Sequence, residues 1–147
     1  MEEQDFITNV IQWAKDRNII DGSSLDAQYL KLIEEIGEIA AAKARGNREA
    51  MIDGIGDAMV VCVIMGKIGR EAGWKSPVWV SIGVLARLSD VVRSSTVCVF
   101  ARSVFVRLCD FAVTEGIDPS EAMQSAWVAI KDRKGKLIDG VFVKESE

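Results

Sequence analysis

Residues 31–40 read KLIEEIGEIA and residues 53–65 read DGIGDAMVVCVIM, and these two stretches decide the fold. In the first, apolar residues recur at helical spacing. In the second, they fill almost every position after Asp57. Gly46 and Asn47, which lie between the stretches, favour the end of one helix and the start of the next across a tight turn. The sequence therefore predicts two long antiparallel helices side by side.

Weaker helical patterns occupy most of the remaining chain. Apolar spacing and capping residues predict helices over about 6–17, 24–46, 48–69, 98–112 and 119–130. Residues 74–97 also have apolar residues at near-helical intervals, and we assign them to a helix. A basic turn, KDRKGK at 131–136, precedes a short irregular tail. We expect an all-α bundle of four to five helices that forms a single domain over residues 1–147.

Composition and charge exclude several classes of protein. The 147-residue chain is 49% hydrophobic, and its net charge of -4 argues against an extended nucleic-acid surface. Met1 is followed by acidic residues, which is the wrong charge for a signal peptide. Charged residues interrupt the apolar regions before they reach membrane-spanning length. We expect a cytoplasmic protein with no membrane and no nucleic-acid polymer as partner.

The chain contains no histidine, which limits the available chemistry. Ser-His-Asp catalysis and imidazole zinc sites are excluded within one chain. Cys62, Cys98 and Cys109 are widely spaced among apolar residues, so we expect buried free thiols rather than disulfides or a zinc site. Acid, base or metal chemistry must therefore use carboxylates, lysines or water.

The carboxylates of the two long helices are unusually concentrated. Glu34, Glu35 and Glu38 repel one another on one helix, and Asp53 and Asp57 form an i, i+4 pair on the next. Both groups lie about the same distance from the turn, so they can face each other. Several carboxylates without imidazole or thiolate favour Mg²⁺ or Mn²⁺. A divalent metal site is one interpretation of this pattern.

The alternative interpretation involves no metal. Paired glutamates on helices are commonly solvated, and Lys31 lies one turn before Glu35, where it can form a salt bridge. In that case the protein is a helical interaction or regulatory module whose carboxylates pair with lysines and arginines. The spacing of the residues alone leaves both interpretations open.

Three segments resemble one enzyme family. KLIEEIGEIA and DGIGDAMVVCV resemble the two-helix metal motif of the MazG-like, all-α nucleoside triphosphate pyrophosphohydrolases. KDRKGKLIDGVFVKE at 131–145 resembles the C-terminus of the phage-type members. The resemblance covers about a third of the chain. It implies a four-helix core, an obligate dimer or tetramer, and Mg²⁺-dependent hydrolysis of a nucleoside triphosphate to the monophosphate and pyrophosphate.

The motif assigns the metal ligands residue by residue. Glu35, Glu38 and Asp57 match the ligand positions of the family. The second motif departs from the family pattern, because Gly54 stands where a carboxylate is usual and Asp53 comes one residue earlier. Asp53 can therefore act as a substitute ligand, directly or through water.

Further residues are candidates for the substrate and the proton. Glu34 or Glu38 can accept the proton of an attacking water. Lys31, Arg133 and Lys134 are candidates to hold phosphate oxygens, and Gln28 shares the helical face of Lys31. Trp13 can stack on a base, although core packing is the commoner role of a tryptophan.

The resemblance to phage-type members suggests control of the nucleotide pool in the host cytoplasm. The motifs carry no base-specific code, and the resemblance suggests a purine such as dGTP as the substrate. Residues 58–65 and 98–112 are apolar over more than one face. We therefore expect a homodimer or homotetramer that buries one of these faces against a second copy.

Overall fold

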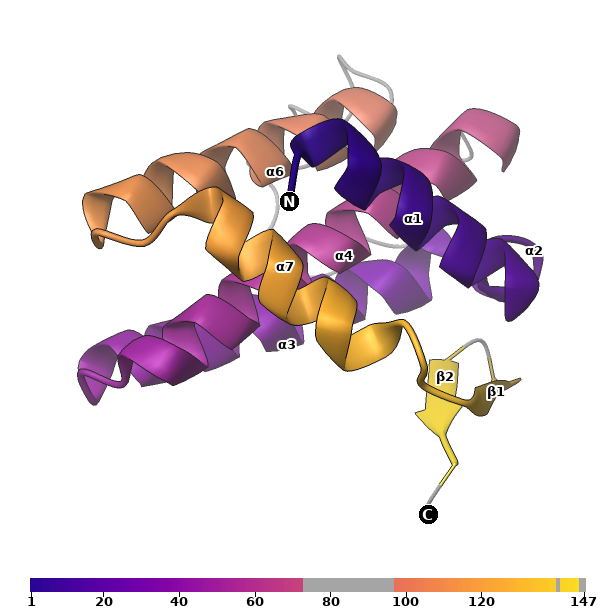
Figure 1. Ribbon diagram of the computed structural model, residues 1–147. Helices are drawn as coiled ribbons and strands as arrows, with labels where there is room; N and C mark the ends of the chain where they lie inside the picture. Colours follow the sequence, from indigo (N-terminus) through magenta and orange to yellow (C-terminus); the bar gives the residue numbers. More distant parts are fainter. Residues whose placement is uncertain (73–96, 140, 146–147) are drawn as a thin grey trace.

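The computed structural model describes residues 1–72, 97–139 and 141–145. Its helices are α1 (Glu3–Asp16), α2 (Ile19–Gly22), α3 (Leu25–Ala44), α4 (Arg48–Ala72), α6 (Val97–Thr114) and α7 (Pro119–Ile130). Two short strands, β1 (Gly135–Ile138) and β2 (Val141–Lys144), follow them (Figure 1). The predicted all-α class is confirmed. The helix expected over 74–97 lies almost entirely outside the described residues.

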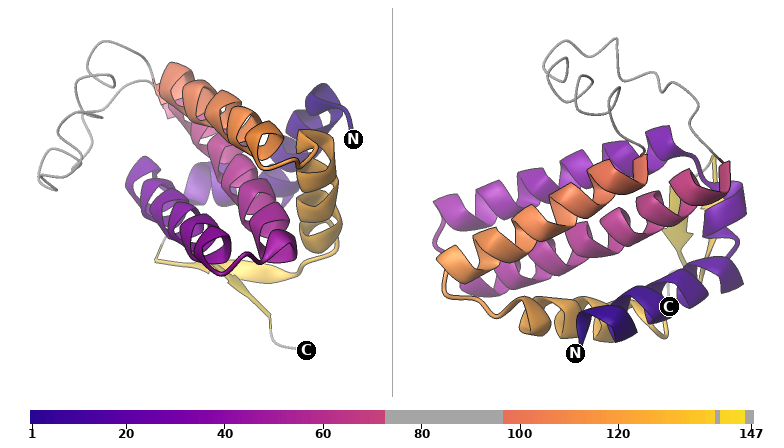
Figure 2. Two further views of the ribbon diagram at one scale, coloured as in Figure 1. Left: turned by 90° about the vertical axis from the view of Figure 1, so that its left-hand side faces the viewer. Right: turned by 90° about the horizontal axis from the view of Figure 1, so that it is seen from above.

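Helix α4 is the centre of the bundle. Figure 2 shows it between α3, α6 and α7, with α1 beside α7. Its apolar run Ala58–Met65 is buried on every side within the single chain. This corrects one step of the oligomer argument, because the chain's own helices cover α4 and leave no face of this run for a second copy. The exposed apolar side chains of α3 and α6 lie elsewhere: Leu30, Ile33, Ile36, Val106 and Val113.

The helix boundaries follow from local capping. The Ser24 hydroxyl accepts a hydrogen bond from the Ala27 amide at the start of α3. Asn47 caps α4 in the same way through the Ala50 amide. Gly46, with a φ of 64°, adopts the left-handed conformation that turns the chain from α3 into α4. These caps match the sequence prediction.

Two glycines of α4 permit close packing of neighbouring helices. A Cβ on Gly54 would lie 2.9 Å from Cγ1 of Ile39 on α3. A Cβ on Gly56 would lie 2.4 Å from the carbonyl oxygen of Ala122 on α7. The missing carboxylate at position 54 thus has a structural reason, since a side chain there would force Ile39 of α3 to shift.

The C-terminal segment differs from the prediction. Instead of an irregular tail, β1 and β2 form an antiparallel hairpin in which Leu137 pairs with Phe142 and Gly135 with Lys144. Alternation along a strand places Leu137, Phe142 and Lys144 on one face, and Leu137 and Phe142 pack against the helical core. The apolar alternation of LIDGVFV was the sequence signal for this hairpin.

The described cysteines are free thiols. Cys62 is buried and Cys109 is partly buried, and both are free. Burial raises the pKa of the Cys62 thiol to about 12, so it stays protonated. Among the described helices, none combines the length and the apolar character needed to cross a membrane.

Candidate functional site

A pocket of about 210 Å³ lies where α1, α3, α4 and the end of α7 meet the hairpin. Its charged lining residues are Lys31, Glu35, Asp57, Arg133 and Lys144. Trp13, Gln28 and Phe142 line it as well, together with aliphatic side chains of α4. We call it the carboxylate pocket. It combines two acids, three bases and two aromatic rings, and this mixture is typical of ligand sites rather than of plain core packing.

Glu35 is the most buried acid of the described chain, with only 3% of its surface exposed. It lies on the core side of α3 between Leu32 and Ile39, which are also buried. One oxygen, Oε1, is 2.6 Å from Nζ of Lys31. The other, Oε2, is buried without a hydrogen-bond partner among the described residues. A buried carboxylate oxygen in this state costs free energy unless a ligand, a water or an ion binds it.

Asp57 shares the pocket with Glu35 but belongs to α4. Burial and, to a lesser extent, the nearby negative charge of Glu35 together raise the pKa of the Asp57 carboxyl to about 6. The positive charges of Arg133 and Lys31 oppose this rise. The two carboxylates therefore repel each other across the pocket, and a cation between them would relieve the repulsion.

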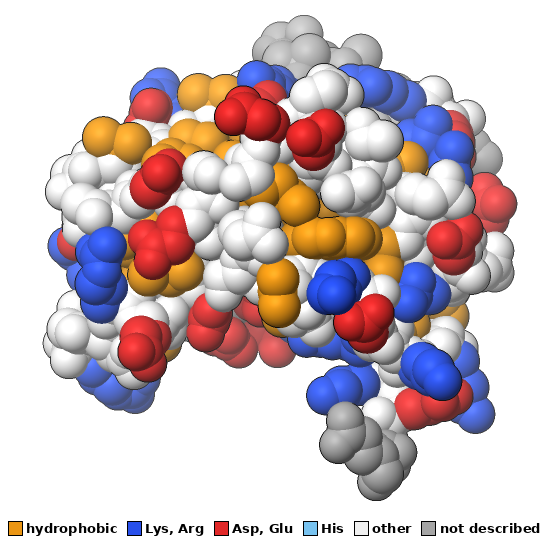
Figure 3. All heavy atoms as spheres, in the orientation of Figure 1, with side chains coloured by type: hydrophobic (Ala, Val, Ile, Leu, Met, Phe, Trp, Pro, Cys, Tyr) orange, Lys and Arg blue, Asp and Glu red, His pale blue; other side chains and the backbone are white. Residues whose placement is uncertain are grey.

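Arg133 and Lys144 bring positive charge from the C-terminal segment. Figure 3 shows basic side chains gathered around the hairpin, at lower right. Within the described residues neither Arg133 nor Lys144 forms a salt bridge, and Nε of Arg133 is buried without a hydrogen-bond partner. Both cations are therefore available to an anionic ligand.

Arg17 fastens the basic turn to α1. Its Nε donates to the Arg133 carbonyl oxygen at 2.8 Å, and a second guanidinium nitrogen donates to the Lys131 carbonyl at 3.4 Å. The guanidinium also lies 4.8 Å from the centroid of the Trp13 ring. Arg17 thus fixes the backbone on which Arg133 enters the pocket.

The aromatic wall consists of Trp13 and Phe142. The two rings meet edge to face with their centroids 5.6 Å apart. The Trp13 Nε1 group is buried and has no hydrogen-bond acceptor among the described residues. Glu35, Arg133 and Trp13 thus each bring an unsatisfied buried polar atom to the lining of one pocket.

The residues predicted for the site divide into two sets. Trp13, Gln28, Lys31, Glu35, Asp57 and Arg133 line the carboxylate pocket. The predicted residues Glu34, Glu38, Asp53 and Lys134 are exposed and do not line it. Gln28 is buried and donates to the Ser23 hydroxyl at 3.0 Å.

The exposed acids have other surroundings. Glu34 pairs with Lys31 at 3.3 Å, and Asp53 accepts a hydrogen bond from the Ser125 hydroxyl at 2.8 Å. Across the described ranges, no group of three or more acids or cysteines is arranged to hold a metal ion. The four predicted ligands Glu35, Glu38, Asp53 and Asp57 therefore do not gather into one cage in this structure.

Phe142 and Lys144 were not predicted as site residues. Their segment was expected to be irregular, so no sequence pattern placed them at the pocket. Once the hairpin is known, the i, i+2 spacing of the two residues puts both on the face toward the helices.

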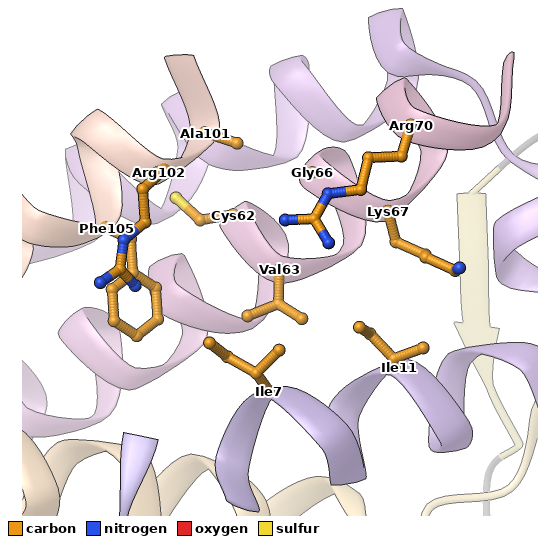
Figure 4. Close-up of a pocket in the computed structure, with 10 residues that line it drawn as sticks. All are labelled: Ile7, Ile11, Cys62, Val63, Gly66, Lys67, Arg70, Ala101, Arg102 and Phe105. Atoms are coloured by element: carbon orange, nitrogen blue, oxygen red, sulfur yellow. The ribbon is translucent and has the colours of Figure 1, made fainter. Parts of the chain in front are cut away.

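A second, smaller hollow of about 70 Å³ lies between α1, α4 and α6 (Figure 4). We call it the cationic hollow, because its charged lining residues are Lys67, Arg70 and Arg102 and no acid lines it. Lys67 pairs with Glu71 at 2.7 Å, and Arg102 pairs with Glu3. Figure 4 shows Arg102 beside the Phe105 ring, whose centroid is 5.6 Å away.

Comparison with known proteins gives one relative of phage origin. Over 64 residues the chain is 42% identical to the "uncharacterized 18.2 kDa protein in rep-hol intergenic region" of Haemophilus phage HP1 (strain HP1c1). The match covers 44% of this chain and 39% of that protein, so the chain spans well under two thirds of its relative. No known protein family and no solved structure matches the chain.

Proposed function

We propose that the protein is a Mg²⁺-dependent nucleoside triphosphate pyrophosphohydrolase and that the carboxylate pocket is its active site. The observation that carries the proposal is the pocket lining, where the acids Glu35 and Asp57 face three cations and two aromatic rings. A magnesium triphosphate has the same mixture of charges together with a flat base. The resemblance of residues 31–40 and 53–63 to the MazG-like motif supports the same reaction.

The two pocket acids fit a magnesium ion that arrives with the substrate. Mg²⁺ in proteins is commonly held by one or two carboxylates, with waters and substrate phosphates as the other ligands. The unsatisfied Glu35 Oε2 and the repulsion between Glu35 and Asp57 would both be relieved by such an ion. Glu38 and Asp53, outside the pocket lining, would act through water or from its rim. Mn²⁺ would substitute.

The reaction divides into tasks for named residues. Glu35 and Asp57 would hold Mg²⁺, which would supply positive charge to offset the phosphates and to activate a water. Lys31 and Arg133 hold phosphate oxygens, and Trp13 packs against the base. The water oxygen bonds to the α-phosphorus, the bond between that phosphorus and the α–β bridging oxygen breaks, and pyrophosphate leaves with the bridging oxygen. One of the exposed acids of α3, Glu34 or Glu38, accepts the water's proton.

Two further elements belong to this proposal. A phage relative fits a role in nucleotide-pool control in the host cytoplasm, with a purine nucleotide such as dGTP as first candidate. Helix α3 exposes three large apolar side chains, those of Leu30, Ile33 and Ile36, and these support a homodimer or homotetramer. Light scattering at micromolar concentration should report at least a dimer. A monomer that is fully active would contradict this element.

The test is a pyrophosphate-release panel over all canonical ribo- and deoxynucleoside triphosphates with Mg²⁺. We expect turnover of at least one substrate, its loss in chelator and its return with Mn²⁺. The alternative, a helical interaction module, is favoured by the 2.6 Å Lys31–Glu35 ion pair, which already partners one of the two acids. Calorimetric titration with Mn²⁺ separates the two, because a module predicts neither heat of binding nor turnover.

A further inference from the structure

We propose that the C-terminal hairpin is a substrate-binding wall, in which Lys144 holds the phosphate chain and Phe142 packs against the base. This inference rests on the proposed function and names two binding residues beyond it. Both residues line the carboxylate pocket although they lie in the last few residues of the described chain.

The strand register gives Lys144 its orientation. Phe142 is partly buried against the helical core, so the face of β2 that carries it points toward the pocket. Lys144 lies two residues later and therefore on the same face. Lys136 lies on the other face of the hairpin, is exposed and does not line the pocket. One hairpin thus carries one lysine toward the site and one away from it.

Charge supports a phosphate ligand at Lys144. Lys31 is already paired with Glu34 and Glu35, so it offers a phosphate less free positive charge than Lys144 or Arg133 does. Lys144 and Arg133 form no salt bridge in the described part of the chain. Their positive charges are therefore not neutralised by the pocket acids. A polyphosphate is the ligand class that uses such cations beside two acids that hold a metal.

Packing supports a base at Phe142. The Phe142 ring lies across Gly135, where a Cβ would come within 2.5 Å of its Cζ. The absence of a side chain at Gly135 therefore allows the ring to lie close to β1 and to meet Trp13 edge to face. Trp13 and Phe142 together form an apolar wall beside the charged groups, which matches a nucleotide with its base next to its phosphates.

Matched variants separate the two contacts. The probes are tripolyphosphate and the non-hydrolysable α,β-imido analogues of dGTP and dCTP, each titrated with Mg²⁺ by calorimetry. Lys144→Ala should weaken all three probes about tenfold, because it removes a charge-assisted contact to phosphate. Lys136→Ala makes the same charge change on the other face of the hairpin and should leave binding within twofold. Lys144→Arg should restore most of the affinity.

Phe142→Leu keeps an apolar side chain at the core but removes the ring. It should weaken both nucleotide analogues about fivefold and leave tripolyphosphate unchanged. Thermal unfolding of each variant checks that the fold survives. If Phe142→Leu weakened tripolyphosphate as much as the nucleotides, the ring would have only a structural role and the assignment would be wrong.

The outcomes also separate this inference from the proposed function. Equal affinity of Lys144→Ala and Lys136→Ala would overturn the inference even in an active enzyme. Binding that depends on Lys144 without hydrolysis of any nucleotide would uphold the inference and overturn the proposed reaction. A wild-type protein that binds none of the probes would overturn both.

Discussion

The carboxylate pocket and the cationic hollow both adjoin α4, but they differ in whether their polar groups have hydrogen-bond or ion-pair partners. The carboxylate pocket takes Asp57, Val60, Val61 and Ile64 from α4, whereas the cationic hollow takes Cys62, Val63, Gly66 and Lys67 from another side of the same helix. In the hollow, Lys67 and Arg102 have carboxylate partners at the surface. In the pocket, Glu35, Arg133 and Trp13 each keep a buried polar atom without a partner among the described residues.

This difference indicates which of the two binds a ligand. Positive charge and concave shape occur in both, so neither property distinguishes them. Unsatisfied buried groups destabilise a fold, and proteins retain them where a ligand completes the hydrogen bonds. Among the described residues, the carboxylate pocket has this signature and the cationic hollow lacks it, so changes to the two should have unequal consequences.

The largest effect should come from removing one pocket carboxylate. Glu35→Gln is nearly isosteric and should lower kcat about 10³-fold, because a neutral amide holds Mg²⁺ far more weakly than a carboxylate and the positive charge that stabilises the transition state is lost. Glu71→Gln makes the same change beside the cationic hollow and should leave kcat within twofold. Initial rates of pyrophosphate release measure both. A Glu35→Gln protein with near-normal turnover would remove the basis of the proposed site.

The next effect concerns stability on two sides of α4. Gly56→Ala places a methyl group 2.4 Å from the Ala122 carbonyl oxygen, which is backbone and cannot rotate away. We expect a loss of roughly 1–3 kcal/mol in the free energy of unfolding. Gly66→Ala, at the cationic hollow, brings its methyl group 3.8 Å from the Ala101 Cβ, an ordinary contact.

The Gly66 variant serves as the control for this clash. Alanine favours the helix over glycine by about 1 kcal/mol, so Gly66→Ala should leave stability unchanged or raise it. Urea unfolding followed by circular dichroism measures both variants. Equal stabilities would mean that α7 packs against α4 less closely than the structure shows.

The raised pKa of Asp57 predicts that this residue of the carboxylate pocket makes the free energy of unfolding depend on pH. Its folded pKa of about 6 lies above the usual aspartate value, so folding favours the protonated form. The Asp57 contribution is therefore fully present below about pH 4 and is lost as the pH rises through 6. Asp57→Asn should stabilise the metal-free protein at pH 7.5 by at most about 3 kcal/mol, and much less at pH 4.

Urea unfolding in chelator across pH 4 to 8 measures this difference. Asp53→Asn is the matched control, since Asp53 is exposed and hydrogen-bonded to Ser125. A pH-independent gap between the wild-type protein and Asp57→Asn would show that Asp57 does not titrate in this range. Added Mg²⁺ should reduce the gap if the two acids hold the ion.

The sequence predicted the helices better than the site, and the reasons are physical. Helix boundaries depend on local signals such as the Ser24 and Asn47 caps, and these are visible in the sequence. Which acids share a pocket depends on helix rotation and on contacts distant in sequence. Glu35 and Glu38 are three residues apart, yet Glu35 is buried and Glu38 is exposed.

The hairpin is the clearest example of a distant contact. LIDGVFV alternates weakly over few residues, and a strand this short is stable only when it packs against other elements. Phe142 packs near Trp13, and the Gly22 backbone lies so close to the Leu137 side chain that a Cβ there would be 2.5 Å from Cδ1. These partners lie more than 100 residues away, so no local pattern placed Phe142 and Lys144 at the pocket.

The smallest effect should come from Arg17, which touches the pocket only through its neighbours. Arg17→Ala removes the hydrogen bonds to the Arg133 and Lys131 carbonyl oxygens and the contact with the Trp13 ring. Arg133 then has a less fixed backbone, so we expect KM for the triphosphate to rise about threefold with kcat nearly unchanged. Arg17→Lys should not rescue it, because an ammonium group lacks the planar fork that reaches both carbonyls.

A measurement that does not depend on activity tests whether Arg17 holds the basic turn at 131–136 in place. Trypsin cleaves after lysine and arginine, and residues 131–136 offer several such sites. Loosening this turn should accelerate cleavage there in Arg17→Ala, whereas Lys15→Ala, an exposed change on the same helix, should leave the rate unchanged. The hydrogen bonds described for Arg17 lie outside the cationic hollow. The rate of cleavage near Arg70 should therefore be the same in Arg17→Ala as in the wild-type protein. Equal cleavage of the turn in both variants would show that Arg17 does not hold the C-terminal segment against the pocket.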